Sequence, residues 1–434
     1  MSFSAPFTTG INPDLWIKIA TFAGDSPGIR PLLSTNVSPQ CRGNDEFMPR
    51  SDGDTDEMAS DFERRRFIKA ASAAGLIGLA GCSGGPSGSG DGSGGGNASD
   101  GSSGSDGGEG SDEPPATVGI VYSDGGLGDN SFNDAAQQGI LQAEEEFGIA
   151  YDESEPDGAG EFGQFQQLYA SSTDPDYDLV SCIGFNQGDA LSETAPQFPD
   201  QDFMIVDTTV DEPNVANYLF REHEGSFLMG VLAGRLTETD FSAGAGATAP
   251  DSTNVGFVGG VDSPVIRRFQ AGFEAGVDYA SDDVDVITSY VGSYADPSGG
   301  REQALSMYQS GADIVYHAAG ATGVGVFQAA QSEGRFAFGV DQDQSVSEPS
   351  FADVIVASMV KRVDTAVYES ISNVIDGSHQ GGNTIALGLE SNGVECVYGQ
   401  EIGGQVPEDI KTAVADARDE IIAGNIDVPE TTSN

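Results

Sequence analysis

The stretch TVGIVYSDGGLGDNSFNDAAQQGILQAEEEFG, residues 117–148, decides the fold class of this chain. It opens with a run of apolar and β-branched residues that is typical of a buried strand, and a glycine-rich polar loop follows. From residue 130 onward the apolar residues recur at helical spacing, which predicts a helix. A buried strand, a polar loop and a helix in this order form the repeating unit of α/β proteins with parallel sheets.

The same unit recurs along the chain. Six further runs are predicted to be buried parallel strands: DLVSCIG (178–184), DFMIVDT (202–208), NVGFVGG (254–260), VDVITSYVG (284–292), ADIVYHAA (312–319) and FAFGV (336–340). Helices are predicted in EGSFLMGVLAGRLTE (224–238), VIRRFQAGFEAGVDYA (265–280) and GREQALSMYQSG (300–311). This alternation predicts an α/β fold with doubly wound parallel sheets flanked by helices and joined by right-handed crossovers.

The loops that follow the predicted strands share an unusual composition. They are polar or rich in glycine: SDGGLGDNSFND (123–134), DTTVD (207–211), GGVDSP (259–264), GSYADPSGG (292–300), AAGATGVG (318–325) and VDQDQS (340–345). In doubly wound sheets a ligand binds outside the carboxyl ends of the strands. We therefore expect these loops to hold the functional site.

An export signal is predicted in ERRRFIKAASAAGLIGLAGC, residues 63–82. Arg64 and Arg65 precede a short apolar run that ends at Cys82, as in a twin-arginine signal joined to a lipoprotein cleavage site. The run is too short to span a bilayer, which takes about 20 residues. We expect a signal over 58–81, a lipid on Cys82 and a Gly/Ser/Asp linker over 82–115, which place the protein on the extracytoplasmic face of the cell membrane. A short amphipathic helix on a cytosolic protein is the alternative.

Residues 1–57 precede this signal and show no sustained apolar period. Signals normally begin near the first residue, and Met58 stands just ahead of this one. We expect translation to begin at Met58, or alternatively at Met48, and residues 1–57 to be an unstructured over-extension.

The chain is strongly acidic, with 69 acidic and 18 basic residues and a formal charge of −51. Such a polyanion repels nucleic acid and anionic lipid headgroups, so neither is an expected partner. The acids are spread through predicted helices and strands rather than gathered in one tail. In molar salt the screening length falls to about 3 Å, so the repulsion between these charges is weak. We therefore interpret the surface as adapted to molar salt, and it resembles that of haloarchaeal proteins.

Cysteine and histidine usage argues against a metal site. Cys182 and Cys396 stand in apolar contexts and are predicted to be free buried thiols, with a disulfide between them as the alternative. No CxxC or HExxH spacing occurs, and neither a GK[ST] phosphate loop nor GxGxxG follows a strand. We expect no metal, no ATP and no NAD, and hence no cofactor.

Several longer motifs carry a family resemblance: GGLGDNSFND (125–134), NVANYLFREHEGSFLMGVLAG (214–234), GFVGGVDSPVIRRFQAGFEAGV (256–277), GVFQAA (325–330), GVDQDQ (339–344) and SMVKRVDTAVYESI (358–371). With them the chain resembles the basic membrane protein (BMP) family, the PnrA-like nucleoside-binding lipoproteins of ABC importers. The resemblance implies a binding protein rather than an enzyme, a purine nucleoside as ligand and a membrane permease as partner.

The resemblance also implies the two-lobed type I periplasmic-binding fold over 116–430, with three hinge crossings. One lobe is expected to comprise about 116–221 and 346–380, and the other about 222–345 and 381–430. The ligand is expected between the lobes, whose closure would signal occupancy to the permease.

The expected base site combines residues that match family positions. Phe132 and Tyr294 are expected to stack on the two faces of the base, Asn133 to bind its edge, and Gly320 to let the backbone approach the ligand. Stacking on a base is worth about 1–3 kcal/mol. The alternatives are a helix-packing role for Phe132, a cap for Asn133 and a surface position for Tyr294.

The expected sugar site consists of carboxylates that end predicted strands, Asp124, Asp207 and Asp341, because a carboxylate accepts hydrogen bonds well from a ribose diol. Asp341 matches the family's ribose-binding aspartate, with Asp343 as its competitor in the same motif. Lys361 matches the family's cleft lysine and is expected at the start of a helix.

Three other functions stay open at this level. The same fold could bind a sugar or a flavin, or report ligand to a membrane partner as a sensor. An exported nucleoside hydrolase would need clustered carboxylates around a metal or a nucleophile and base pair. The candidate aspartates are instead scattered along the chain.

Overall fold

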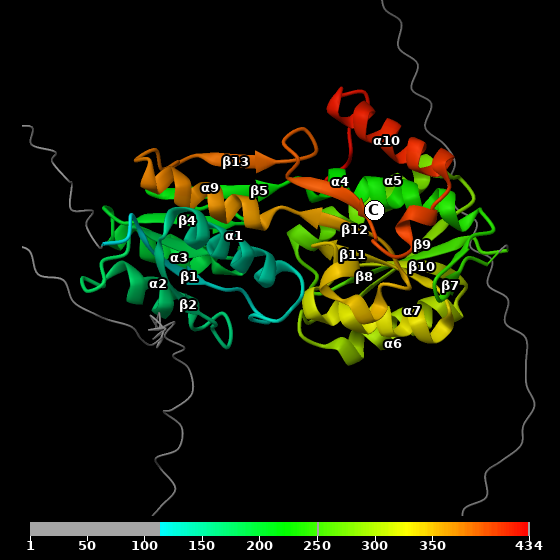
Figure 1. Cartoon of the computed structure of the whole chain (residues 1–434), viewed down its shortest axis with the longest axis horizontal. Coiled ribbons are helices and arrows are strands. Elements are labelled where there is room, and N and C mark those ends of the chain that lie inside the picture. The colour runs from blue at the N-terminus through cyan, green and yellow to red at the C-terminus, as the bar shows by residue number, and fades with distance from the viewer. Residues whose placement is uncertain (1–112, 250, 433–434) are drawn as a thin grey trace, which may run out of the picture. The chain divides into compact units, whose positions relative to one another are not determined.

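The structure is a computed structural model that describes residues 113–249 and 251–432. The expected signal with Arg64 and Arg65, the expected lipidation site Cys82 and residues 1–57 lie outside the described residues. Within the described part, none of the helices is both long enough and apolar enough to cross a membrane. Two six-stranded sheets dominate this part of the chain, and helices cover both faces of each (Figure 1).

The first sheet is entirely parallel. Its strands lie in the order β13 (Thr384–Leu387), β5 (Val215–Phe220), β4 (Asp202–Val206), β3 (Leu179–Cys182), β1 (Thr117–Val121) and β2 (Ala150–Ser154). Its helices are α1 (Phe132–Phe147), α2 (Phe162–Ala170), α3 (Gly188–Thr194) and α9 (Val363–Ile375). Helices α1 and α9 pack on each other, as do α2 and α3. We call this sheet with its helices the first lobe.

The second sheet forms the second lobe. Its strands lie in the order β14 (Val394–Tyr398), β12 (Ile355–Lys361), β11 (Phe336–Asp341), β10 (Ala312–Ala318), β8 (Asn254–Gly259) and β9 (Asp285–Tyr290). All neighbours are parallel except β14, which runs antiparallel to β12. The remaining elements are α4 (Glu222–Thr237), α5 (Pro264–Ala280), α6 (Pro297–Gln309), α7 (Gly323–Glu333), α8 (Gln344–Ser347), α10 (Glu408–Ile422) and the hairpin β6 (Ser242–Ala243) and β7 (Gly246–Ala247).

Burial on both faces explains why the central strands read as continuous apolar runs. In β4, Met204 and Val206 join the core beneath α1, whereas Phe203 and Ile205 join the core beneath α2 and α3. All seven strands predicted from the sequence form, and the doubly wound, two-lobed α/β class is confirmed. The edge strand β2 was not predicted, because its sequence AYDES is polar and mostly not buried, and β5, β12, β13 and β14 were not predicted either.

The chain passes between the two sheets three times, from β5 to α4, from β12 to α9 and from β13 to β14. The expected lobe boundaries need correction at the second and third of these crossings. Strand β12 pairs in parallel with β11 and so lies in the second lobe, although 346–380 was assigned to the first. Strand β13 pairs with β5 and lies in the first lobe, although 381–430 was assigned to the second. The returning segment of the first lobe is therefore about 363–387.

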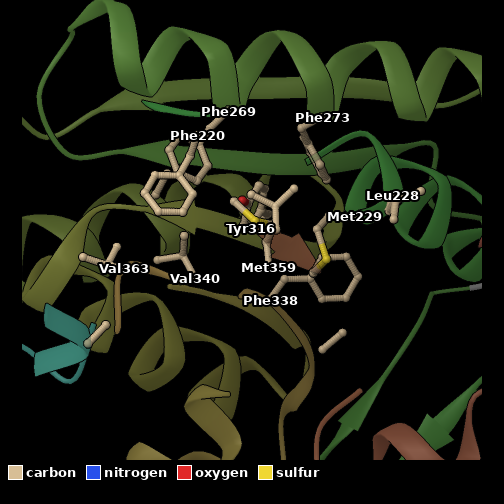
Figure 2. Packing of buried hydrophobic residues seen from close by; sticks show 14 of the residues in the cluster. Phe220, Leu228, Met229, Phe269, Phe273, Tyr316, Phe338, Val340, Met359 and Val363 are labelled. Atoms are coloured by element: carbon tan, nitrogen blue, oxygen red, sulfur yellow. The ribbon is translucent and has the colours of Figure 1, made fainter. Parts of the chain in front are cut away.

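One continuous apolar cluster runs through the crossings. It includes Phe220 at the end of β5 and Val363 at the start of α9, together with Phe269 and Phe273 of α5 and Met359 of β12 (Figure 2). Phe220 and Val363, which flank the first two crossings, are thus packed into the core, whereas residues 390–392 of the third crossing are exposed.

Helix α4 is buried on all sides except at Arg235, because it packs against α5, α10 and the second sheet. Glycines make its contact with α5 unusually close. A Cβ atom on Gly276 of α5 would stand 2.1 Å from the backbone oxygen of Phe227, and one on Gly230 of α4 would stand 2.2 Å from the backbone oxygen of Phe273. The two helix backbones therefore meet without intervening side chains.

We expect Gly276→Ala to lower the free energy of unfolding by about 1–3 kcal/mol, because the added methyl group forces α4 and α5 apart. Alanine favours helix by about 0.5–1 kcal/mol over glycine, so the loss is net of that gain. Gly160→Ala is the matched control, since a Cβ there meets nothing within 4 Å. Denaturant unfolding of both variants measures the effect, and equal midpoints for Gly276→Ala and wild type would contradict the close packing.

Candidate functional site

A pocket lies between the two lobes at the carboxyl ends of their strands. Its empty volume, counted with the space open to solvent, is about 550 Å³. All eight residues predicted for the ligand line it: Asp124, Phe132, Asn133 and Asp207 from the first lobe, and Tyr294, Gly320, Asp341 and Lys361 from the second. Segments separated by more than 200 residues in sequence are thus brought together.

The structure distinguishes the two aspartates of the GVDQDQ motif. Asp341 is the last residue of β11 and lines the pocket. The competitor Asp343 instead caps α8, where its carboxylate accepts a hydrogen bond from the backbone nitrogen of Ser345 at 3.1 Å, and it also accepts one from Gln400 at 3.0 Å. Of the two, Asp341 is therefore the candidate for ligand contact.

Two of the three buried carboxylates that line the pocket, Asp207 and Asp341, stand on strained backbone. Asp207, directly after β4, has φ of 71°, and Asp341 has φ of 64°. Asparagine and aspartate adopt this left-handed region more readily than other residues with a side chain, yet it still costs free energy. Such strain is typical of functional sites, because the surrounding structure must hold it in place.

Helix α1 begins at Phe132, inside the pocket, and an aspartate that the sequence analysis did not single out fixes its start. The Asp129 carboxylate accepts from the backbone nitrogens of Ser131 at 2.9 Å, Asn133 at 2.9 Å and Asp134 at 3.2 Å. Asp129 therefore caps the helix, and the Ser131 hydroxyl is free to donate to Asp341 in the other lobe. Burial raises the pKa of Asp129 to about 6, although these backbone donors lower it.

Asn133 serves mainly to hold the loop around the pocket. Its Oδ1 accepts from the backbone nitrogen of Ser123 at 2.9 Å, and its Nδ2 donates to Asp129 at 3.1 Å. One hydrogen on Nδ2 stays available, because an amide has two. Contact of Asn133 with a base edge thus remains a prediction that depends on that hydrogen.

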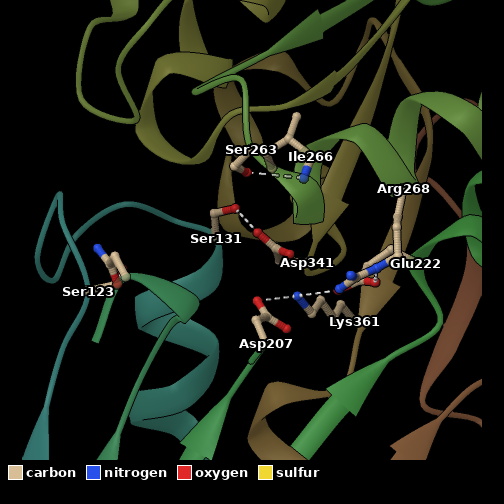
Figure 3. A network of polar contacts seen from close by, with 10 residues as sticks. Ser123, Ser131, Asp207, Glu222, Ser263, Ile266, Arg268, Asp341 and Lys361 are labelled. Atoms are coloured by element: carbon tan, nitrogen blue, oxygen red, sulfur yellow. Dashed lines mark hydrogen bonds and ion pairs between the residues drawn. The ribbon is translucent and has the colours of Figure 1, made fainter. Parts of the chain in front are cut away.

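Lys361 is the cation of the pocket and is 2 % exposed. It was expected at the start of a helix, and this was wrong: it is the last residue of β12, and α9 begins at Val363. Its Nζ lies 2.6 Å from Asp207 Oδ2 and 3.2 Å from Glu222 Oε1 (Figure 3). The same atom faces three aromatic rings, with ring centroids at 5.0 Å for Phe220, 5.1 Å for Phe132 and 5.6 Å for Phe269.

These surroundings determine the protonation of the pocket. Burial raises the pKa of Asp341 to about 7, while Lys361 and the Ser131 hydroxyl lower it. Burial alone would lower the pKa of Lys361, but Asp207, Glu222 and Asp341 outweigh it and raise that pKa. Lys361 is therefore charged at neutral pH. Asp341, in contrast, changes its protonation close to neutral pH.

The remaining predicted residues lie at the rim and on one wall. Asp124 is half-buried and accepts from Asn186 Nδ2 at 2.8 Å. Tyr294 packs flat on Gly260, where a Cβ would stand 2.5 Å from the ring. Gly320 has φ of 56° and abuts the Tyr294 backbone, so a glycine at this position admits that residue. Burial raises the pKa of the Tyr294 hydroxyl to about 12.

Other pocket residues were not predicted as ligand contacts, namely Ser123, Asp129, Gly184, Phe185, Val265, Ile266, Phe269, Ala318, Ala319 and Val340. Phe269 and Ile266 lie on α5 at spacing that also fits its core face, so periodicity alone could not separate the two roles. Phe185 stands shortly after the end of β3. Its position after a strand could have predicted it as a pocket residue.

The two cysteines are free, as predicted, and Cys182 is fully buried whereas Cys396 is half-buried. Within the described residues, no group of three or more histidine, cysteine, aspartate or glutamate side chains could hold a metal ion.

The two lobes with a pocket at the carboxyl ends of their strands define the class of periplasmic-type substrate-binding proteins. Residues 116–432 match the family described as ABC transporter substrate-binding protein PnrA-like, and the chain belongs to this family. The resemblance in the sequence motifs is thereby confirmed, and members of the family are substrate-binding proteins of ABC transporters.

Named relatives agree with this assignment. The CD4+ T-cell-stimulating antigen of Listeria monocytogenes is 34% identical over 334 residues, which cover 72% of this chain and 88% of the antigen. The ABC transporter nucleoside-binding protein BmpA of Lactococcus lactis is 32% identical over 329 residues, or 71% of this chain and 88% of BmpA. Among solved structures, an ABC transporter solute-binding protein of Aeropyrum pernix has a TM-score of 0.64 and 29% identity, and the match covers 73% of this chain and 94% of that chain.

We expect the raised pKa of Asp341 to make the ligand-free protein less stable as pH rises. Its folded-state pKa of about 7 exceeds the ordinary 3.8, so its contribution is fully present below about pH 4 and is lost as pH rises through about 7. The Asp341→Asn variant should lose less stability over that window, by about 1–4 kcal/mol. Chemical unfolding at a series of pH values measures this difference, and parallel curves for the two proteins would contradict it.

Proposed function

We propose that this substrate-binding protein takes a purine nucleoside into the cleft and delivers it to the permease of an ABC importer. The observation that carries the proposal is the meeting of aromatic side chains, buried carboxylates and one lysine in a single pocket between the lobes. A nucleoside needs both parts, an apolar face for the base and acceptors for the ribose hydroxyls. The name of the Lactococcus relative, a nucleoside-binding protein, supports this choice of ligand.

In this proposal the base stacks between Phe132 of the first lobe and Tyr294 of the second. Both side chains line the pocket and come from opposite lobes, so a flat ligand between them would hold the lobes together. Stacking contributes about 1–3 kcal/mol per base and tolerates different bases. The Tyr294 hydroxyl and the free hydrogen of Asn133 are the groups that could select among purines.

The ribose hydroxyls donate to Asp341 and Asp207 in this proposal, with Asp124 at the rim. Each carboxylate oxygen can accept from a hydroxyl, and hydrogen bonds to a charged acceptor are stronger than neutral ones. The carboxylates that line the pocket outnumber its one lysine, which disfavours a phosphate, because like charges repel strongly where burial removes water. A nucleoside therefore fits better than a nucleotide.

The test is thermal unfolding of the full chain in molar KCl with purine and pyrimidine nucleosides, free bases, ribose and riboflavin. A ligand at about 100 times its dissociation constant stabilises by about 2.7 kcal/mol. We expect purine nucleosides to raise the midpoint and free bases or ribose alone not to. A response only to riboflavin or to sugars would contradict the nucleoside assignment. Release of free base from a nucleoside on incubation would instead indicate a hydrolase.

Phe132→Ala tests the stacking role in the same assay. We expect its affinity for the best nucleoside to fall by about 1–3 kcal/mol, and the ligand-free midpoint to fall as well, because Phe132 also faces Lys361 and packs on the core. Tyr279→Ala is the matched control, because Tyr279 is an aromatic residue that is 53 % exposed and outside the pocket. Equal affinities for Phe132→Ala and wild type would remove the stacking role.

A lipid anchor on Cys82 completes the proposal. The sequence places Cys82 at the end of a signal, and a relative from Pyrococcus horikoshii that is 34% identical is named a lipoprotein. An anchored receptor stays near its permease, which raises its effective concentration there. The protein would then act on the extracytoplasmic face of the cell membrane.

We expect Cys82→Ser to release the protein from the membrane fraction without changing its ligand affinity. The reason is that serine cannot form the thioether that carries the lipid, while the pocket lies in another part of the chain. Cys396→Ser is the matched control, because Cys396 is a free thiol far along the chain from the signal, and it should leave the protein on the membrane. Fractionation of native-host cells followed by immunoblotting measures both, and membrane retention of Cys82→Ser would contradict lipid anchoring.

A further inference from the structure

The buried lysine of the pocket has more negative partners than one cation needs. Lys361 Nζ contacts Asp207 at 2.6 Å and Glu222 at 3.2 Å, and Asp341 acts on it through charge. Asp207 and Asp341 line the pocket, whereas Glu222 does not. Asp207 and Asp341 can therefore reach a ligand in the pocket, whereas Glu222 can compensate only the lysine.

Glu222 occupies a place that neither solvent nor ligand reaches. It is 0 % exposed and is the first residue of α4, immediately after the crossing from β5. Its Oε1 lies 3.2 Å from Lys361 Nζ as an ion pair without a hydrogen bond, and its Oε2 accepts from Arg268 Nε at 2.9 Å. With a cation on each side, its carboxylate stays ionised: burial would raise the pKa of Glu222, but Lys361 and Arg268 together lower it.

Both partners of this contact stand at the pivot between the lobes. Glu222 follows the first crossing by one residue, and Lys361 ends β12 just before the second. Residues at a pivot change their separation least when lobes open or close. Glu222 and Lys361 belong to the second lobe, whereas Asp207 belongs to the first, so the Lys361–Asp207 distance depends on closure and the Lys361–Glu222 distance does not.

One carboxylate oxygen of Asp207 has no hydrogen-bond donor. Its Oδ2 faces Lys361, but its Oδ1 is buried and has no hydrogen-bond partner. Leaving a buried carboxylate oxygen unpaired costs free energy, since water no longer solvates it. Because Asp207 lines the pocket, a ligand hydroxyl is the donor that would satisfy this atom.

We propose that Glu222, held by Arg268, is a positioning residue for ligand binding: it is the permanent counterion of Lys361, and it thereby leaves Asp207 with a carboxylate oxygen for a donor on the ligand. The inference rests on the proposed function only for the nature of that donor, a nucleoside hydroxyl. Without Glu222, Lys361 would depend on Asp207 and Asp341 alone, and both would be drawn away from the ligand.

The counterion role can be tested without any ligand, because the chain has only four lysines, Lys18, Lys69, Lys361 and Lys411. Lysine-specific ¹³C and ¹⁵N labelling of the full chain gives four side-chain signals, which single Lys→Arg variants assign. We expect Glu222→Gln to lower the pH at which the Lys361 signal titrates, since it removes a negative charge 3.2 Å away. An unchanged titration would overturn the proposal whatever the ligand is.

Glu224→Gln is the matched control. Glu224 lies two residues further along α4 and is also buried, yet it binds Arg221 at 3.0 Å and the backbone nitrogen of Leu389 at 2.8 Å rather than Lys361. Its substitution should leave the Lys361 titration in place. A shift of equal size in Glu224→Gln would mean that any change at the crossings moves the lysine, and it would overturn the specific role of Glu222.

Binding is measured by calorimetric titration with guanosine between pH 5.5 and 8.5. We expect Glu222→Gln to weaken guanosine binding about tenfold or more and Glu224→Gln to change it less than about twofold. No guanosine binding by wild type counts against the proposed function and leaves the lysine titration to decide the role of Glu222. Wild-type affinity in Glu222→Gln, with a shifted lysine signal, would overturn the link to binding.

Removing one partner of a buried ion pair can unfold a protein, because the other charge is left uncompensated. Arg268→Met combined with Glu222→Gln removes both charges and keeps similar volumes. We expect this double variant to fold and to show the same lowered Lys361 titration and weakened guanosine binding. A folded double variant with wild-type titration would overturn the proposal.

Discussion

The enclosure of the Lys361 ammonium group is the interaction on which the arrangement of the pocket depends. An ammonium cannot be removed from water without close compensation, and here three aromatic faces, Asp207 and Glu222 provide it. These partners come from both lobes: Asp207 follows β4, Glu222 begins α4, and the rings belong to Phe132 of α1, Phe220 of β5 and Phe269 of α5. One side chain thus fixes the relative positions of elements that the chain connects only through its hinge. The same requirement explains the close approach of carboxylates that would otherwise repel one another.

Parallel sheets explain why the candidate site could be predicted from sequence at all. The carboxyl ends of all parallel strands meet along one edge of a sheet. A polar residue directly after a buried strand therefore lies at that edge. Asp207 and Asp341 were found in this way, and the buried runs that precede them are long enough to be read without ambiguity. Phe132, Tyr294 and Lys361 needed the family motifs as well, since an aromatic residue or a lysine near a helix has many ordinary roles.

The features that could not be predicted from the sequence depend on contacts between residues that are distant along the chain. Glu222 and Arg268 lie on helices in apolar surroundings, and no pattern distinguishes a buried, paired charge from a solvated one on a helix face. Lys361 was expected on a helix because only Arg362 separates the end of β12 from the start of α9, with no turn residue to mark the boundary. Asp129 was missed as the cap of α1 because Ser131 stands at the usual position, and only the structure shows that its hydroxyl is bound to Asp341 instead. The lobe boundaries were misplaced because strand pairing, which assigns β12 and β13 to their sheets, is a long-range property.

Lysine and arginine are distributed unequally between the lobes, and this determines which lobe supplies the cation of the Lys361–Asp207 ion pair. Residues 113–220 and 363–387, which form the first lobe, contain no lysine or arginine. Any side-chain cation other than a protonated histidine that compensates a buried carboxylate of this lobe must therefore come from the second lobe or from the hinge. For Asp207 that cation is Lys361, and the first lobe has none of its own to replace it. A change in the separation of the lobes consequently alters the electrostatic free energy of Asp207, and a ligand that satisfies its unpaired oxygen acts on the same balance. The acidic composition of the chain thus makes the ion pair between the lobes a physical link between occupancy of the pocket and lobe position.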